Sequence, residues 1–367
     1  MKENKRGRPD FLLLLSAVLL VGFGLVMVFS ASSPIAIAKH TSSWHFVSRQ
    51  ALFASLGLIL MLLCMGIRYS FWQKAAPLLL LFSLLLLALV LIAGTEINGG
   101  KRWFVVGGFN FQPSELAKFT MIIYLAALIS KKGDKLRNLQ HGLLPILIVV
   151  GLILLLVLRQ PDFGTVLILL FISSVMILTG GARIIHLAVI ALALVPVFVY
   201  LSVSKSYRLE RMNAFLNPFA SPYDTGYQLI QSLYALGHGG ITGTGIGKSV
   251  QKRFYLPEAH TDFIYAVVGE ELGFIGSMLL FAVFLLYIWR GLWIAVRSSD
   301  VFGMMTAIGI VAMIMIQFLL NIGAVTGSLP ITGVPLPFIS YGGSSLLLNM
   351  TCTGILLSVS REVRRRA

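Results

Sequence analysis

Long apolar runs recur along this chain of 367 residues, and they constrain its fold more than any other feature. A helix needs about 20 apolar residues to cross the ~30 Å hydrocarbon core of a bilayer, and open strands cannot satisfy their backbone groups there. Hydrophobic residues make up 57% of the chain and charged residues only 12%, whereas soluble domains carry about 25% charged residues. The sequence therefore predicts an all-α integral membrane protein.

We expect ten membrane-spanning helices in a single membrane domain over residues 1–367. Their approximate ranges are 11–31, 46–67, 75–94, 114–130, 142–159, 163–180, 183–203, 264–289, 302–325 and 341–359. The first is interpreted as a retained span, because its apolar run is longer than the about 7–15 residues typical of a signal peptide.

The formal net charge of +15 is explained by membrane orientation rather than by nucleic-acid binding. Lys and Arg collect in alternate short connections, including the N-terminus, the segment KKGDKLR at 131–137 and the C-terminal REVRRR. Cytoplasmic loops of membrane proteins carry such an excess. The pattern predicts a multi-pass protein of the cytoplasmic membrane with both termini in the cytoplasm.

A long outer segment, 204–263, separates the seventh and eighth spans. Structureless loops of that length are uncommon and usually functional. Two amphipathic stretches, SYRLERMNAFLNPF and GYQLIQSLYALGHGG, predict helices lying on the outer membrane face. The basic residues Lys248, Lys252 and Arg253 would contact either the anionic headgroups of membrane lipid or a phosphorylated lipid substrate.

The outer segment ends in LPEAHTDFIYAVVGEE, which places Asp262 where the chain re-enters the membrane. A partly desolvated acid at that depth is a candidate base or metal ligand. The sequence leaves open whether Glu258, Glu270 and Glu271 bind a metal or only shape the site. One His near these acids is weak evidence for a metal centre.

Two further polar groups lie at the ends of predicted spans. Glu115 and Lys118 are three residues apart and face one side of a helix, so they form either a structural ion pair or the wall of a polar cavity. Asp162 could cap the helix that follows it or belong to a site, and Arg159 beside it is equally ambiguous.

The segment VTGSLPITGVPLPFISYGGSS at 325–345 is rich in Gly and Pro and predicts a broken or re-entrant segment. Non-helical backbone at membrane depth is tolerated only where it is buried in protein or lines a cavity. Ser344 and Ser345 could therefore be polar contacts of a site, or they could serve packing.

The segments QPSELAK, RQPDFGT, YQLIQSLYALGHGG, LPEAHTDFIYAVVGEELGFIG and TGVPLPFISYGGSS, in this order, resemble those of the SEDS family of membrane proteins (shape, elongation, division and sporulation). The resemblance covers essentially the whole chain and is closest to the division and sporulation branch. It implies a peptidoglycan glycosyltransferase that polymerises lipid II at the outer face of the cytoplasmic membrane. It also implies that Asp262 is the functional acid and that Glu115 and Lys118 form the cavity pair.

The implied reaction joins an incoming disaccharide to a chain carried on undecaprenyl pyrophosphate. One carboxylate can act as general base, and we expect Asp262 to do so. The leaving pyrophosphate needs charge neutralisation, from Lys and Arg of the outer segment or from a divalent cation such as Mg²⁺ or Mn²⁺. Family members are expected to pair with a class B penicillin-binding protein, a transpeptidase.

The alternative is a flippase that moves lipid II outward. Transporters tend to show internal repeats and binding sites at the membrane midplane. The sequence shows no internal repeat, and its informative acids lie near the outer face. These features favour an enzyme over a transporter.

Overall fold

The computed structural model describes residues 7–38, 40–97, 99–107, 109–186, 188–189, 192 and 214–363. The predicted seventh span lies mostly outside these residues, as does the first half of the stretch SYRLERMNAFLNPF.

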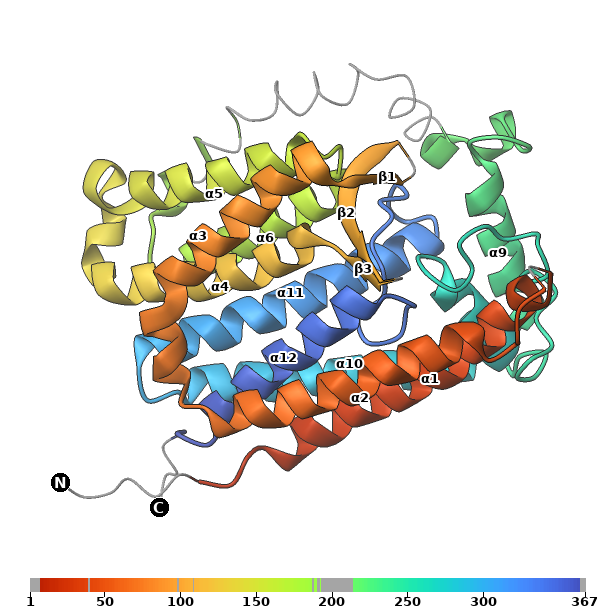
Figure 1. The fold of residues 1–367 in the computed structure, drawn as a ribbon, viewed down its shortest axis with the longest axis horizontal. Helices are drawn as coiled ribbons and strands as arrows, with labels where there is room; N and C mark the ends of the chain where they lie inside the picture. Colours follow the sequence, from red (N-terminus) through yellow and green to blue (C-terminus); the bar gives the residue numbers. More distant parts are fainter. Residues whose placement is uncertain are drawn as a thin grey trace.

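Within the described part of the chain, eight helices are long and apolar enough to cross a membrane, and α6 is a shorter apolar helix (Figure 1). Together they are α1 (Phe11–Ala38), α2 (His45–Gly66), α3 (Tyr69–Ala93), α4 (Pro113–Lys132), α5 (Leu144–Leu158), α6 (Phe163–Thr179), α10 (Ile264–Val296), α11 (Val301–Val325) and α12 (Gly343–Ser360). The nine spans predicted within the described residues are confirmed. The largest differences are that α1 continues beyond residue 31, α3 begins earlier and α10 ends later. The protein is therefore a multi-pass membrane protein.

Helices α4 and α11 form the centre of the bundle. In the most apolar 18-residue stretch of each of these two helices, 72% of the residues are buried, whereas in α2 and α3 only 28% are buried. The outer helices therefore present most of their apolar surface to lipid, which accepts it without cost because hydrocarbon tails are as apolar as Leu.

Glycines let α2 and α12 pack closely. A Cβ atom on Gly57 would lie 2.5 Å from the sulfur of Met350, and one on Gly354 would lie 2.3 Å from the carbonyl oxygen of Met61. Small residues at such contacts are typical of membrane helix pairs, because van der Waals packing drives their association.

A small antiparallel sheet follows α3 and was not predicted. Its strands are β1 (Thr95–Ile97), β2 (Gly100–Val106) and β3 (Phe109–Phe111), in the order β1-β2-β3. Figure 1 shows the sheet at the same end of the bundle as the start of α4. The all-α prediction is therefore right for the spans and incomplete for the connection between α3 and α4.

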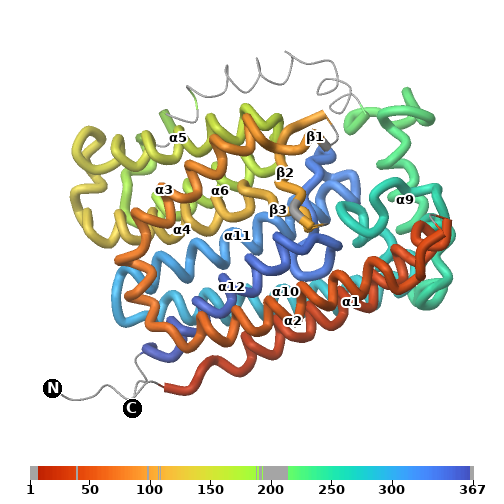
Figure 2. Tube along the Cα trace, viewed as in Figure 1, coloured from red at the N-terminus to blue at the C-terminus, as the bar shows by residue number. Residues whose placement is uncertain are grey.

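The two ends of the described chain meet at one end of the bundle (Figure 2). The amide of Gly7 donates to the carbonyl oxygen of Arg361 (2.8 Å), and Asp10 forms an ion pair with Arg290 near the end of α10. The sheet and helix α9 (Tyr227–Gly239) lie toward the other end. We call this second end the outer end.

Candidate active site

Asp262 lies in the turn immediately before α10, and two neighbouring segments fix that turn. The Nδ2 of Asn321 in α11 donates to the carbonyl oxygens of Asp262 (2.7 Å) and Val334 (2.8 Å). The Oγ of Ser340 donates to the carbonyl oxygen of Thr261 (2.6 Å). These bonds hold the backbone on either side of the half-buried Asp262 side chain. Asn321 was missed, although a polar residue inside an apolar span is a signal of a polar interior.

The segment between α11 and α12 passes close to the Asp262 carboxylate. A Cβ on Gly333 would lie 3.4 Å from Oδ2 of Asp262, and Gly333 has a φ of +69°. This segment is non-helical and buries Leu336 and Ile339, which confirms the predicted broken segment. Gly333 suits this position because it adopts positive φ at no steric cost and lets the backbone approach the acid.

Three aromatic rings pack beside the same turn. The ring centroid of His260 lies 5.2 Å from that of Phe46 and 5.7 Å from that of Tyr341. The amide of Tyr341 donates to the carbonyl oxygen of His260 (3.0 Å). Burial raises the pKa of Tyr341, against a smaller lowering by Arg49, so its phenol stays protonated at neutral pH.

Asp162 caps α6, as the capping interpretation predicted. Its Oδ1 accepts from the amide of Thr165 (3.1 Å), and its Oδ2 accepts from the Thr165 hydroxyl (2.9 Å) and from Nε2 of Gln112 (3.1 Å). A Cβ on Gly164 would lie 2.6 Å from the carbonyl oxygen of Thr332. The start of α6 therefore touches the segment that passes Asp262.

Arg102 of β2 holds the turn between α5 and α6. Its Nε donates to the carbonyl oxygen of Gln160 and its Nη2 to that of Pro161, both at 2.8 Å. Arg159 in the same turn is exposed, and its role toward a substrate stays a prediction. Arg102 was missed because the sheet that presents it was missed.

Ser344 and Ser345 both make contacts within the protein. The hydroxyl of Ser344 donates to the carbonyl oxygen of Asn110 in β3 (2.8 Å). The hydroxyl of Ser345 accepts from Nδ2 of Asn349 (3.4 Å). The first contact joins the start of α12 to β3 of the sheet at the outer end.

Glu115 and Lys118 form a buried ion pair at the start of α4. The Nζ of Lys118 lies 2.7 Å from Oε1 of Glu115, and the two residues are 1% and 5% exposed, respectively. Oε2 of Glu115 and both side-chain polar atoms of Gln317 in α11 lack a hydrogen-bond partner among the described residues. Buried polar atoms are normally satisfied by protein or ordered water, so this arrangement favours a polar interior beside the pair.

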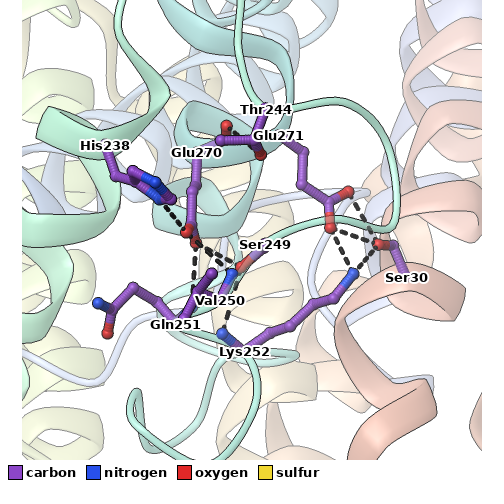
Figure 3. A network of polar contacts seen from close by, with 9 residues as sticks. All are labelled: Ser30, His238, Thr244, Ser249, Val250, Gln251, Lys252, Glu270 and Glu271. Carbon is purple, nitrogen blue, oxygen red and sulfur yellow. Dashed lines mark hydrogen bonds and ion pairs between the residues drawn. The ribbon is translucent and has the colours of Figure 1, made fainter.

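Glu270 anchors the outer segment onto α10 (Figure 3). Its carboxylate accepts from Nδ1 of His238 (2.9 Å), from the hydroxyl of Ser249, and from the amides of Val250 (2.9 Å) and Gln251 (3.2 Å). The side chain is fully buried. A buried carboxylate costs several kcal/mol unless it is well bonded, and here four donors satisfy it.

Glu271 forms a second anchor with α1. It accepts from the hydroxyl of Ser30 (2.7 Å) and from Nζ of Lys252, which also donates to Ser30 (2.8 Å). Glu271 is 0% exposed and Lys252 is 4% exposed. Figure 3 shows that these side chains converge from α1, the outer segment and α10. In this structure Glu270 and Glu271 therefore shape the outer end.

A break in α10 allows this docking. Gly273 has a φ of +64°, and a Cβ there would lie 2.3 Å from the amide nitrogen of Gly243. The amides of Thr244 and Gly245 donate to the carbonyl oxygens of Glu270 and Glu271 (both 3.0 Å). Helix α9, which precedes this turn, confirms the second predicted amphipathic helix.

The remaining candidate residues are exposed. They are Lys248, Arg253 and Glu258. Within the described residues, no group of three or more His, Cys, Asp or Glu side chains is placed to hold a metal ion. Asp262 is a half-buried carboxylate in the turn before α10, and its catalytic role stays a prediction.

Known proteins are similar to this chain over its whole length. The family model for FtsW, RodA and SpoVE, described as "Cell cycle protein", matches residues 10–365. Stage V sporulation protein E of Bacillus subtilis is 45% identical over 98% of this chain and 99% of its own length. A probable peptidoglycan glycosyltransferase FtsW of Trichlorobacter lovleyi is also 45% identical, over 99% of this chain and 96% of its own.

One solved structure matches with a TM-score of 0.79 at 32% identity, covering 96% of this chain and 98% of the matched one. It is described as "Structural coordination of polymerization and crosslinking by a peptidoglycan synthase complex".

Proposed function

Because the chain belongs to the FtsW/RodA/SpoVE family of cell cycle proteins, we propose that it is a peptidoglycan glycosyltransferase that polymerises lipid II for division or sporulation. The observation that carries the proposal is full-length similarity, at 45% identity, to a protein with that name. The position of Asp262 immediately before the candidate membrane span α10 supports it, since the end of a span lies near the lipid headgroups.

The reaction forms one glycosidic bond and breaks one bond to phosphate. The 4-hydroxyl of the incoming GlcNAc attacks C1 of the MurNAc at the reducing end of the growing chain. The C1–oxygen bond to undecaprenyl pyrophosphate breaks, and the pyrophosphate leaves with the electron pair from the opposite face. An α-linked donor therefore gives a β-linkage with inversion.

Asp262 is assigned the role of general base, which takes the proton of the attacking hydroxyl. A base must lie within hydrogen-bond reach of that proton, and the Asp262 side chain is only half-buried, so that part of it is exposed. The leaving pyrophosphate is a weak base and needs charge neutralisation rather than an acid. The exposed Lys248 and Arg253 and the buried Lys118 are the cations assigned to phosphate groups of the substrates.

We also propose a partner, a class B penicillin-binding protein that crosslinks the glycan strands. Its support is the likeness to a peptidoglycan synthase complex. Polymerisation and crosslinking act on the same strand, so an enzyme of each kind held together would pass the strand directly between sites.

The outer end is assigned to the extracytoplasmic side, and both termini to the cytoplasm. Cys64 and Cys352 are buried, so cysteines introduced as Asp224→Cys and Arg68→Cys can be labelled selectively. A membrane-impermeant maleimide is expected to label Asp224→Cys in intact cells and Arg68→Cys only after permeabilisation. The reverse pattern would invert the topology.

Polymerisation by the purified protein tests the function. We expect the protein, alone or with its cognate transpeptidase, to convert lipid II in vesicles or detergent into long glycan strands. Gel separation of the labelled strands detects this product. If no polymer forms even with the partner present, and the protein instead moves lipid II between leaflets, the flippase replaces the enzyme.

A further inference from the structure

A groove with a volume of about 720 Å³ runs along the outer half of α1. One wall is α1 from Val26 to Ala38, and the other is the outer segment from Ile246 to Phe254. None of its lining residues belongs to the turn that holds Asp262. The groove is therefore a separate feature of the outer end.

The walls of this groove are apolar and open. Ile37 is 62% exposed and Phe254 is 64% exposed, and Val26 and Phe29 lie on the same side of α1. A volume of several hundred Å³ is typical of ligand sites, about 300–1,000 Å³. At the outer end of a membrane helix, such a groove suits a hydrocarbon chain that enters sideways from the bilayer.

The polar edge of the groove carries cationic side chains. Arg253 and Ser30 line it, together with Lys252. Lys252 is paired with Glu271, whereas Arg253 and the nearby exposed Lys248 form no ion pair within the described residues. Guanidinium groups bind phosphate strongly and with defined geometry. The groove therefore complements a lipid with a phosphorylated headgroup.

The distance from this edge to Asp262 distinguishes between the two lipid-linked substrates. Ser30 and Lys252 both bond Glu271, whereas Asp262 lies in the turn before α10, and the helix rises by roughly 10 Å from Ile264 to Glu271. In the donor, the phosphate is bonded directly to the reacting C1. In the acceptor, two sugar rings separate the phosphate from the reacting 4-hydroxyl. A phosphate at the groove edge is too far from Asp262 for the donor and suits the acceptor.

We propose that the groove between α1 and residues 246–254 is the acceptor site. It holds the incoming lipid II by its pyrophosphate, at Arg253 and Lys248, and by the first part of its polyprenyl chain, along α1. The disaccharide then extends from the groove toward Asp262. This assignment rests on the proposed polymerase function, and it places the growing chain elsewhere on the protein.

Photocrosslinking tests occupancy without turnover. An Asp262→Asn protein is incubated with lipid II that carries a photoreactive group in its first isoprene units, and labelled peptides are identified by mass spectrometry. We expect labelling within residues 26–38. Ile37→Trp, which fills the groove, is expected to reduce that labelling by about tenfold or more. Leu279→Trp, at a residue 64% exposed on α10, is the matched control and should label as strongly as the parent protein.

Competition separates the sources of the lipid. A phosphatidylglycerol analogue with a photoreactive acyl chain is added in the same vesicles. We expect lipid II to displace it from residues 26–38. Labelling by phosphatidylglycerol that excess lipid II does not reduce would make the groove a phospholipid site and overturn the acceptor assignment.

Kinetics separate acceptor from donor. With a preformed lipid-linked glycan as donor, Arg253→Gln should raise KM for lipid II about tenfold and change KM for the glycan by less than about twofold. Lys74→Gln, an exposed cation at the opposite end, is the control. A selective rise in KM for the glycan would overturn the proposal. Crosslinking reports binding even if wild-type protein forms no polymer, so failure of the enzyme function remains distinguishable from failure of the groove.

Discussion

Replacing Asp262 by Asn is expected to slow polymerisation of lipid II by about 10²–10⁴-fold, the range in which a positioned general base contributes. The amide has nearly the shape of the carboxylate but cannot accept the proton of the attacking hydroxyl. The turn should survive the change, because Asn321 holds the carbonyl oxygen of residue 262 and not its side chain. The rate of strand growth is measured with labelled lipid II at equal concentrations of monodisperse protein.

Two further variants make this result specific. Asp224→Asn removes an exposed carboxylate from the outer segment and should leave the rate unchanged. Asp262→Glu keeps a carboxylate but displaces it by one methylene, so an intermediate rate is expected from a base that must meet its proton at hydrogen-bond distance. Equal rates for Asp262→Asn and wild type would remove Asp262 from the chemistry.

The spans were predictable from the sequence because a bilayer imposes a length on every crossing segment. Helix α6 at 163–179 was predicted at 163–180, and the helix after Asp262 was predicted to begin at its observed first residue. The N-cap role of Asp162 was also predictable, because capping is a local interaction between a side chain and an amide three residues on.

The sheet was missed because its signal is different from that of a span. The segment TEINGGKRWFVVGGFNF carries turn glycines between short runs of β-branched and aromatic residues, which is the pattern of hairpins. Between two strongly apolar runs it was treated as a connection. Because the sheet was not predicted, the predicted site included neither Arg102 nor the contact of Ser344 with Asn110.

The partners of the outer acids could not be predicted from a single sequence. Ser30 and Glu271 are 241 residues apart in the chain, and no local pattern reports such a contact. The cluster of acids in the segment 258–271 was visible, but Glu270 and Glu271 face the bundle and the outer segment whereas Glu258 is exposed. The fold shows that Glu270 and Glu271 join the outer segment to α10 and α1, whereas the catalytic role of Asp262 stays a prediction.

Lys252→Met is expected to destabilise the protein by about 3–5 kcal/mol, the cost of leaving one partner of a buried ion pair uncompensated. Among the described residues, Glu271 would keep the Ser30 hydroxyl alone as a side-chain donor, in a position with no solvent exposure. Thermal unfolding in detergent, followed by the fraction of protein that stays monodisperse, measures the loss. Lys74→Met, which removes an exposed cation, should change the midpoint little.

The double variant Lys252→Met, Glu271→Leu decides whether the ion pair mainly stabilises the protein or mainly positions the outer segment. Replacing both charges with apolar groups of similar size is often neutral or stabilising, because the desolvation cost of both ions disappears. We therefore expect the double variant to recover most of the stability lost by Lys252→Met. It should polymerise more slowly than wild type, because the groove edge at residue 252 is then no longer tied to Ser30 of α1 and to residue 271 of α10 by side-chain bonds. A double variant as unstable as the single one would show that Glu271 has a further essential partner. A stable double variant with wild-type rate would show that the ion pair does not position the outer segment for catalysis.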